Sequence, residues 1–275
     1  MAASTKPLTY GVVPTTDDEE SVALLEGFCA LLSMHAEVVV EPFRAGSPEE
    51  LAAAFGAGRI DMAWCSPSLF LVADAFSSAR PLVCSVREGL AGYHSVLFVR
   101  ADSPVRSLSD LQGRCGAWVS ETSSSGFIFP RLALASRGLD PSTELSREFF
   151  YDTHGAVAAA VAKGEADVGA TFAVFTNGDP TKPILRAGFD EVDDAEFRVL
   201  FATDLIPSDL VVVNPSILPP DRNALRKAFL GLPHEGPLAE ATRRLFGADG
   251  YEEHDPESLR SLADDIEAGR QLGLL

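Results

Sequence analysis

The sequence has little positive charge and no long apolar run. Lys and Arg number 22 against 40 Asp and Glu among 275 residues, so the formal net charge is −18 at pH 7. Nucleic-acid binders need basic surface to neutralise phosphates, and anionic membranes repel so acidic a chain. No stretch of about 18 apolar residues occurs, so no transmembrane segment is predicted. These absences exclude nucleic acid and membrane insertion. They leave room for a small anionic ligand, because local groups set the field of a binding site.

Motifs for metals, redox chemistry and nucleotides are also missing. The four cysteines (Cys29, Cys65, Cys84 and Cys115) form no CxxC pair, and each sits among apolar residues, as buried free thiols do. The five histidines are scattered, without an HExxH pattern. No Walker loop and no GxGxxG turn occurs. We therefore expect neither a metal nor another cofactor.

The amino-terminal sequence lacks the apolar core of a secretory signal. The chain opens with Met1 and passes directly into a strand-like run that begins at Leu8. We therefore expect a cytoplasmic protein, or a periplasmic one if a leader has been removed.

Apolar runs typical of strands alternate with segments of helical periodicity along the chain. They form two βα series, one over residues 8–86 and one that begins near Tyr93. Such alternation indicates an α/β protein whose sheets are covered by helices. The strands and helices after Asp204 have no sheet of their own to complete, so we expect them to return to the first series.

The sequence therefore predicts two lobes joined by two crossing strands, near residues 87–93 and 201–208. Lobe 1 is discontinuous and comprises residues 1–90 and 204–275, whereas lobe 2 comprises residues 91–203. The 46% of hydrophobic residues are enough for two modest cores. Because interfaces between domains are favoured ligand sites, we expect a binding cleft between the lobes.

A run of hydroxyl residues stands between a predicted strand and a predicted helix. Ser123, Ser124, Ser125 and Gly126 lie at its centre. Hydroxyls and free backbone N–H groups at the positive end of a helix dipole make a ready anion site. An ordinary helix cap is the alternative, but a cap requires only one hydroxyl.

Further polar residues occupy positions where a ligand could reach them. His154 lies between a predicted strand and a helix, where it could donate to an oxyanion, act as acid or base, or simply cap the helix. Tyr93 and Asp209 lie at the two predicted crossings, where each could also be an ordinary surface or turn residue. Cys65 follows Trp64 at the end of a strand and either lines the cleft or is a packed thiol.

Taken in order, several short motifs resemble those of the phosphate-, phosphite- and phosphonate-binding proteins of ABC transporters, which have the type 2 periplasmic binding protein fold. The resemblance runs from about residue 8 to residue 232. Each motif is weak alone, but their ordered series is specific to the fold family. The motifs are Gly58–Trp64, Gly92–Leu97, Ser107–Gly113, Ser123–Phe127, His154, Ala166–Val168 and Leu205–Asp209.

The resemblance implies a site when it is carried over position by position. It implies that the hydroxyls of Ser123–Ser125, with nearby N–H groups including that of Gly126, hold the oxyanion. Tyr93 and His154 would donate further hydrogen bonds. Asp209 falls where the family places a carboxylate near the amino end of the ligand. Trp64, the aromatic residue of the first motif, is also expected at the ligand.

The sequence departs from the family pattern in ways that bear on the ligand. Members that take aminoalkyl phosphonates have a second carboxylate shortly after the Asp-Val strand. Here the corresponding stretch, residues 171–175, has no acid, so aminoalkyl phosphonates are not expected as ligands. The family's tyrosine before the second helix is replaced at Gly46-Ser47. The export signal that a transport protein requires is also absent.

Two functions remain open. The first is a solute-binding or sensor protein that closes on a small phosphonate- or phosphate-like oxyanion; an ABC permease would be its partner only if the chain is exported. The second is a cytoplasmic enzyme on the same fold that acts on a small carboxylate-bearing metabolite. The resemblance extends to such enzymes of menaquinone and thiamine-precursor biosynthesis. Its acid, base or nucleophile would be drawn from His154, Asp209, Cys65 and His94.

Overall fold

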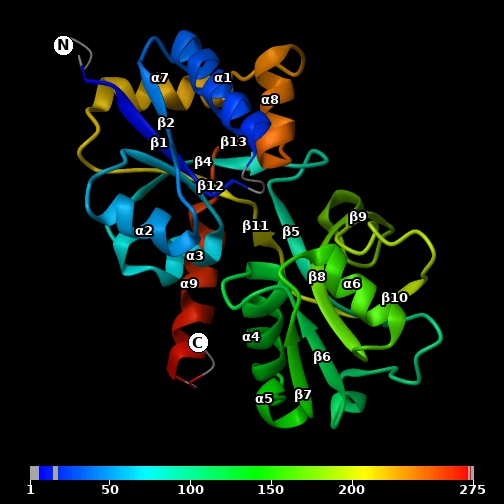
Figure 1. Ribbon diagram of the computed structural model, residues 1–275. Helices are drawn as coiled ribbons and strands as arrows, with labels where there is room; N and C mark the ends of the chain where they lie inside the picture. Colours follow the sequence, from blue (N-terminus) through cyan, green and yellow to red (C-terminus); the bar gives the residue numbers. More distant parts are fainter. Residues whose placement is uncertain (1–5, 15–17, 272, 274–275) are drawn as a thin grey trace. The chain divides into compact units, whose positions relative to one another are not determined.

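The computed structural model describes residues 6–14, 18–271 and 273. The chain divides into two compact units (Figure 1). Unit 1 contains the described residues up to Ala91 and those from Pro207 to Pro256; unit 2 contains Gly92–Ile206 and the described residues from Glu257 onward. The chain therefore passes between the units at three points.

Unit 1 is built on a mixed sheet in the order β13-β4-β12-β3-β1-β2. β1 runs parallel to β2 and β3, whereas β12 runs antiparallel to β3 and β4, and β13 antiparallel to β4. The last part of unit 1 thus returns to complete the first sheet. The strands are β1 (Leu8–Val12), β2 (Val40–Arg44), β3 (Met62–Cys65), β4 (Arg80–Val86), β12 (Leu210–Val213) and β13 (Gly250–Glu252).

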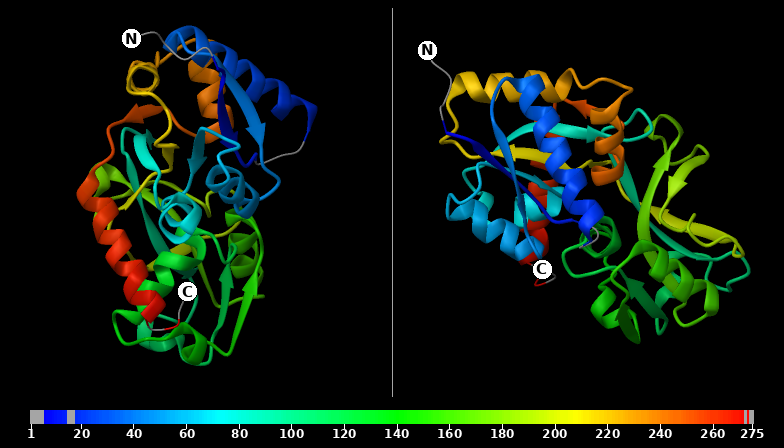
Figure 2. Two further views of the ribbon diagram at one scale, coloured as in Figure 1. Left: turned by 90° about the vertical axis from the view of Figure 1, so that its left-hand side faces the viewer. Right: turned by 45° about the horizontal axis from the view of Figure 1, so that its top comes forward.

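Helices cover both faces of this sheet. α1 (Glu19–Ala36), α7 (Pro219–Leu230) and α8 (Pro237–Phe246) lie together on one face (Figure 2). α2 (Pro48–Gly56), α3 (Pro67–Val72) and the short 3₁₀ helix η1 (Asp74–Phe76) contact one another elsewhere in the unit, α2 against β1 and β3. The larger core lies beneath the first group, where side chains that alternate along β1 meet aromatic rings of the helices.

A buried tyrosine lies at the centre of this core. The side chain of Tyr10 is fully buried, and its ring contacts Phe28, Phe229 and Phe246. Its hydroxyl has no hydrogen-bond partner, and burial raises the pKa of Tyr10 well above its usual value. An unpaired buried hydroxyl opposes folding, because it gives up water without gaining a bond.

Unit 2 contains a second mixed sheet in the order β10-β5-β8-β6-β7, with β9 paired to β8 and β11 to β5. β6 runs parallel to β7 and β8, and β5 runs antiparallel to β8 and β10. The strands are β5 (Gly92–Arg100), β6 (Cys115–Trp118), β7 (Arg147–Phe150), β8 (Val168–Phe175), β9 (Ile184–Ala187), β10 (Phe197–Ala202) and β11 (Ile206–Pro207).

Alternation along β5 supplies two separate cores in unit 2. Leu97 and Val99 pack in one cluster with Leu134 of α4 (Phe129–Ala135), near the short α5 (Pro141–Glu144). Val96 and Phe98 point to the other face, where Phe98 packs in a cluster with α6 (His154–Lys163). The 3₁₀ helices η2 (Leu108–Leu111) and η4 (Thr176–Gly178) lie in the connections.

The carboxy-terminal helix belongs to a different unit from the one predicted. The division predicted from the sequence placed all of residues 204–275 in lobe 1. α9 (Pro256–Gln271) belongs with unit 2 from Glu257 onward. Its apolar side chains Leu262 and Ile266 are buried, and the helix lines a pocket of about 330 Å³ together with α4 and the segment 201–206. The burial of these apolar side chains accompanies the assignment of α9 to unit 2.

No helix in the described part of the chain is both long and apolar enough to cross a membrane.

Replacing Tyr10 by Phe tests the description of the core. The change deletes the unpaired hydroxyl and keeps the ring, so the free energy of unfolding should stay the same or rise by up to about 1 kcal/mol. Urea denaturation of both proteins measures the difference. A loss of more than about 1 kcal/mol would show that the hydroxyl is hydrogen-bonded and would contradict this description.

Candidate functional site

The serine loop, residues 123–126, follows β6 and opens the helix that continues as α4. Its turn, η3 (Ser124–Ile128), is π-helical. Ser123 caps the turn: its Oγ accepts from the Gly126 N–H at 3.1 Å, and its carbonyl accepts from the Ile128 N–H at 2.9 Å. Pro130, the second residue of α4, has no N–H to donate. The wide π-helical turn before it therefore forms its hydrogen bonds without this residue.

Hydrogen bonds hold the serine loop to the sheet of unit 2. The hydroxyl of Ser95, on β5, donates to the Ser125 carbonyl at 2.7 Å. The Gly126 carbonyl accepts from the Val119 N–H at 3.2 Å. A Cβ on Gly126 would lie 2.3 Å from Val119 Cγ2, so only glycine allows this approach. Ser125 is itself buried, yet among the described residues neither its hydroxyl nor its N–H has a hydrogen-bond partner.

His154 begins α6 with one ring nitrogen engaged and one available. Its Nδ1 lies 2.9 Å from Oγ1 of Thr171, and its ring stands edge-on to Phe172 with centroids 5.1 Å apart. Nε2 has no partner among the described residues. Burial lowers the pKa of His154 to about 4, so the ring is neutral at pH 7. A Cβ on Gly188 would lie 2.1 Å from Thr171 Oγ1, so glycine makes room for this pair.

Val119 brings the serine loop and His154 to the same end of β6. Its N–H donates to the Gly126 carbonyl, and its carbonyl accepts from the Asp152 N–H at 2.8 Å, two residues before His154. Both candidate groups therefore lie at the carboxyl end of β6, where ligands of such sheets usually bind.

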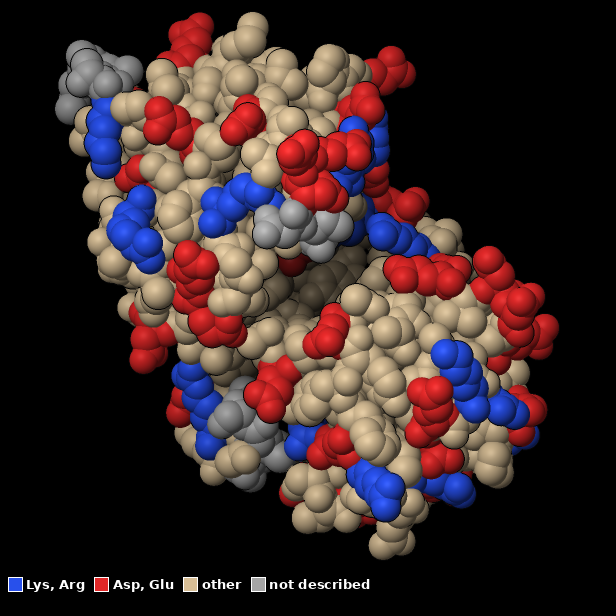
Figure 3. Space-filling model, viewed as in Figure 1, with Lys and Arg blue, Asp and Glu red and all other residues tan. Residues whose placement is uncertain are grey.

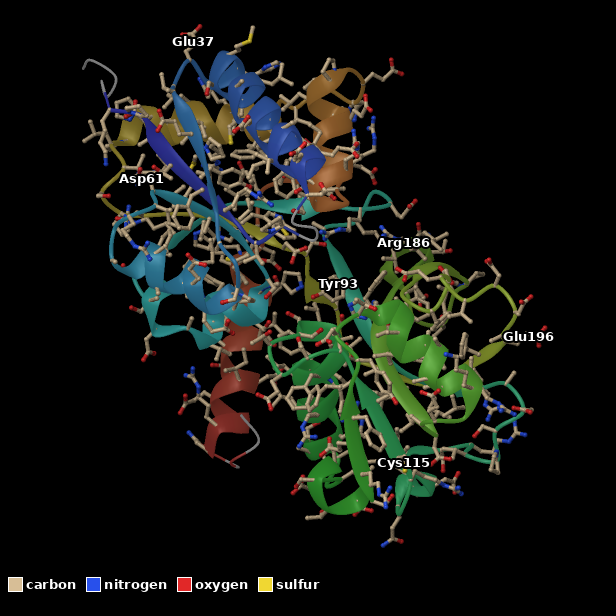
Figure 4. The ribbon with its side chains drawn as sticks, in the orientation of Figure 1. Glu37, Asp61, Tyr93, Cys115, Arg186 and Glu196 are labelled. Atoms are coloured by element: carbon tan, nitrogen blue, oxygen red, sulfur yellow. The ribbon has the colours of Figure 1, made fainter. Side chains whose placement is uncertain are left out.

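The two residues of the Gly-Tyr-His segment on β5 face opposite ways. Tyr93, labelled in Figure 4, is half-buried and shares its sheet face with Ser95, two residues along β5. His94 is buried on the other face, with Nδ1 at 2.8 Å from the Thr203 carbonyl and Nε2 at 3.1 Å from the Gly178 carbonyl. Both nitrogens of His94 are thus occupied by the protein.

The remaining predicted binding residues belong to unit 1. Asp209 pairs with Arg87 at 2.6 Å, and the same guanidinium donates to the carbonyls of Phe246 and Gly247. Trp64 Nε1 lies 3.4 Å from Ser85 Oγ, and the indole packs against the Phe246 ring. That Asp209 and Trp64 share a site with the serine loop stays a prediction.

The four cysteines are free thiols, and three of them are buried as the sequence predicted. Cys29, Cys65 and Cys84 are buried and Cys115 is half-buried. Burial raises the pKa of Cys65, with a further contribution from Asp209, and raises that of Cys29 and Cys84 to about 12. These three thiols are protonated and weakly nucleophilic at pH 7. The described residues also contain no group of three or more metal-ligating side chains.

Sequence reasoning missed the groups that support the serine loop. Arg131 is buried, pairs with Glu148, and lies 4.8 Å from the Phe127 ring centroid. Trp118 Nε1 donates to the same carboxylate at 2.6 Å. Thr171 and Ser95 were missed as well. For Thr171 and Ser95 the available signal was a polar side chain inside an otherwise apolar strand, and for Arg131 a charged side chain inside an otherwise apolar helix.

Comparisons with known proteins agree with these features. A family model described as "ABC transporter, phosphonate, periplasmic substrate-binding protein" matches residues 10–259. The "Phosphate-import protein PhnD" of Mycolicibacterium smegmatis is 23% identical over 259 residues, covering 90% of this chain and 76% of that protein.

Solved structures show the same fold. XAC2383 from Xanthomonas citri bound to ATP has a TM-score of 0.77 and 23% identity, covering 96% of this chain and 98% of that one. PhnD1 from Prochlorococcus marinus in complex with methylphosphonate has a TM-score of 0.70 and 16% identity, covering 98% and 99%. The expected α/β fold of the type 2 periplasmic binding proteins is confirmed. Because the family model spans most of its length, the chain belongs to the periplasmic phosphonate-binding proteins of ABC transporters.

Proposed function

We propose that this protein binds a small phosphonate- or phosphate-like oxyanion at the serine loop. One observation carries the proposal: Ser125 is buried with its hydroxyl and N–H unpaired, at the same end of β6 as the unpaired Nε2 of His154. Among the described residues, the fully buried side-chain atoms without a partner do not include Ser125 Oγ or His154 Nε2, so both atoms can be reached from solvent and are available to a ligand. The methylphosphonate complex of PhnD1 and the ATP complex of XAC2383 support a phosphorus oxyanion.

The donors of this site are neutral. The Thr171 hydroxyl can donate to Nδ1 of His154, which leaves the proton of the neutral ring on Nε2, directed to a ligand. The guanidinium of Arg131 is matched by Glu148, so it adds no net charge beneath the loop. Hydroxyl, N–H and imidazole groups, together with the positive end of the helix dipole, thus hold the anion.

The proposed biological role is that of a solute-binding protein. The family description supports the periplasmic location over the cytoplasmic one and supports an ABC permease as partner. Asp209 and Trp64 are proposed to contribute from unit 1. The lack of an acid in residues 171–175 still disfavours aminoalkyl phosphonates.

In the part of the chain that the structure describes, the candidate catalytic groups do not favour the enzymatic alternative. The thiol of Cys65 is buried and protonated, and Asp209 is held by Arg87. Of the four candidates, His94 has both ring nitrogens within hydrogen-bond distance of carbonyl oxygens, which leaves His154. Its role as a donor to the ligand needs no proton transfer. Turnover assays with the bound ligand test this point.

Ser125→Ala and His154→Ala should each weaken methylphosphonate binding about tenfold to a hundredfold. Each removes one hydrogen bond to a charged group, worth about 1.5–3 kcal/mol. Isothermal titration measures the dissociation constants. Ser136→Ala, on the exposed end of α4, is the matched control and should bind like the wild type. Unchanged affinity in both site variants would refute the serine-loop site.

The choice of ligand follows from the same site. In thermal-shift experiments, phosphate or methylphosphonate should stabilise the protein more than 2-aminoethylphosphonate, because no second carboxylate meets the ammonium group. Larger stabilisation by 2-aminoethylphosphonate would contradict this ranking. A shift produced only by a neutral or aromatic metabolite would contradict oxyanion binding altogether.

The ligand-free protein should lose stability as the pH falls from about 6.5 towards 4. The folded state holds His154 neutral with a pKa of about 4, whereas the unfolded chain takes up the proton near pH 6.5. The loss attributable to this residue is at most about 3 kcal/mol. Urea denaturation across this range should show a steeper decline for the wild type than for His154→Gln. Equal slopes would mean that His154 is not held neutral.

A further inference from the structure

An unpaired cation lies on the same sheet face as the serine loop. Arg186 is exposed on β9, and its guanidinium carbon lies 5.5 Å from the centroid of the Phe172 ring. Among the described residues it forms no ion pair and no side-chain hydrogen bond. The nearest acid along the chain, Asp190, instead accepts from the Ala187 N–H at 2.6 Å.

The strand register places Arg186 beside the proposed site. Ser95 on β5 is opposite Phe172 on β8, and Val174 on β8 is opposite Arg186 on β9. Opposed residues share a sheet face, and so do residues two apart on one strand. Ser95, Phe172 and Arg186 therefore lie on one face, and Ser95 is the residue that fastens the serine loop to it.

The Phe172 ring contacts both Arg186 and His154, the imidazole donor of the proposed site. The ring meets the His154 ring edge-on at 5.1 Å and carries the Arg186 guanidinium over its face at 5.5 Å. One aromatic ring thus separates the guanidinium from the imidazole. Figure 4 shows Arg186 and Tyr93 towards one end of unit 2, with Cys115 at the other end.

Arg186 lacks a carboxylate partner among the described residues although the chain is acidic. The chain carries a net charge of −18, and acidic side chains are spread over the face shown in Figure 3. Arg87, Arg131 and Arg244 each pair with a carboxylate. Arg186 is held against an aromatic ring instead, which leaves its fork of N–H donors available for a planar anion.

We infer that the ligand carries a second anionic group, which Arg186 binds while the serine loop binds the phosphonate or phosphate group. This inference rests on the proposed function and narrows its ligand class. The class is a phosphonate or phosphate ester whose organic part ends in a carboxylate or a second phosphate. The acid-free stretch of β8 fits the same class, because a carboxylate there would repel such a group.

Two ligands of matched size test the inference: 3-phosphonopropionate, with a terminal carboxylate, and propylphosphonate, without one. Isothermal titration should show that the wild type binds 3-phosphonopropionate about tenfold more tightly. Arg186→Met should bring this ratio close to one. Arg59→Met is the matched control, because Arg59 also lies over a phenylalanine ring, 5.8 Å from the Phe43 centroid, and belongs to unit 1. It should keep the wild-type ratio.

Equal affinities in the wild type, or an unchanged ratio in Arg186→Met, would overturn the inference and leave the proposed function intact. A ratio that falls equally in Arg59→Met would also overturn it, since the effect would then come from net charge alone. If methylphosphonate and both longer phosphonates fail to bind the wild type, the proposed function itself is overturned, and this inference with it.

Discussion

The two main-chain hydrogen bonds of Val119 are the constraint on which the candidate site depends. One holds the Gly126 carbonyl and the other holds Asp152, so a single residue joins the serine loop to the segment that leads into His154. Gly126 is needed because any side chain there would collide with Val119. The Ser95 hydroxyl adds a third attachment from β5. The donors are therefore positioned before a ligand arrives, which lowers the entropy that binding must overcome.

The electrostatics of the site follow from burial more than from charge. His154 is kept neutral because burial disfavours its charged form, and Arg131 is balanced by Glu148 under the Phe127 ring. A neutral set of donors suits an oxyanion whose own charge changes near neutral pH. The net charge of −18 therefore disfavours only non-specific binding of anions, in which no hydrogen-bond donors offset the repulsion. Arg186 stands apart from this pattern as a cation held by an aromatic ring.

Much of the fold was predictable because the hydrophobic periodicity and the positions of helix-cap and turn residues agree along the chain. Residues 210–213 were read as a strand that returns to the first sheet, and β12 lies between β3 and β4. Glu37 adopts a left-handed conformation and ends α1, so β2 begins only at Val40. The division predicted from the sequence placed α9 in lobe 1, whereas it belongs with unit 2 from Glu257 onward. The sequence shows that Leu262 and Ile266 are apolar, but not which unit buries them.

The candidate site, like the fold, could be predicted only in part. Serines in a row at a strand–helix junction predict an anion loop from chemistry alone, and His154 follows from its position after a strand. Thr171 and Arg186 could not be found, because Thr171 meets His154 only where α6 packs on β8, and Arg186 is placed by the register of β9 on β8. The pairing of Asp209 with Arg87 also joins residues that are 122 positions apart.

The most direct test of the account is the imidazole ¹⁵N spectrum of His154 at pH 7, recorded before and after addition of methylphosphonate. The account predicts a neutral ring with its proton on Nε2, and a change in that resonance when the ligand accepts from it. A ring that is protonated on Nδ1 alone, or an Nε2 resonance that does not respond to saturating ligand, would contradict it.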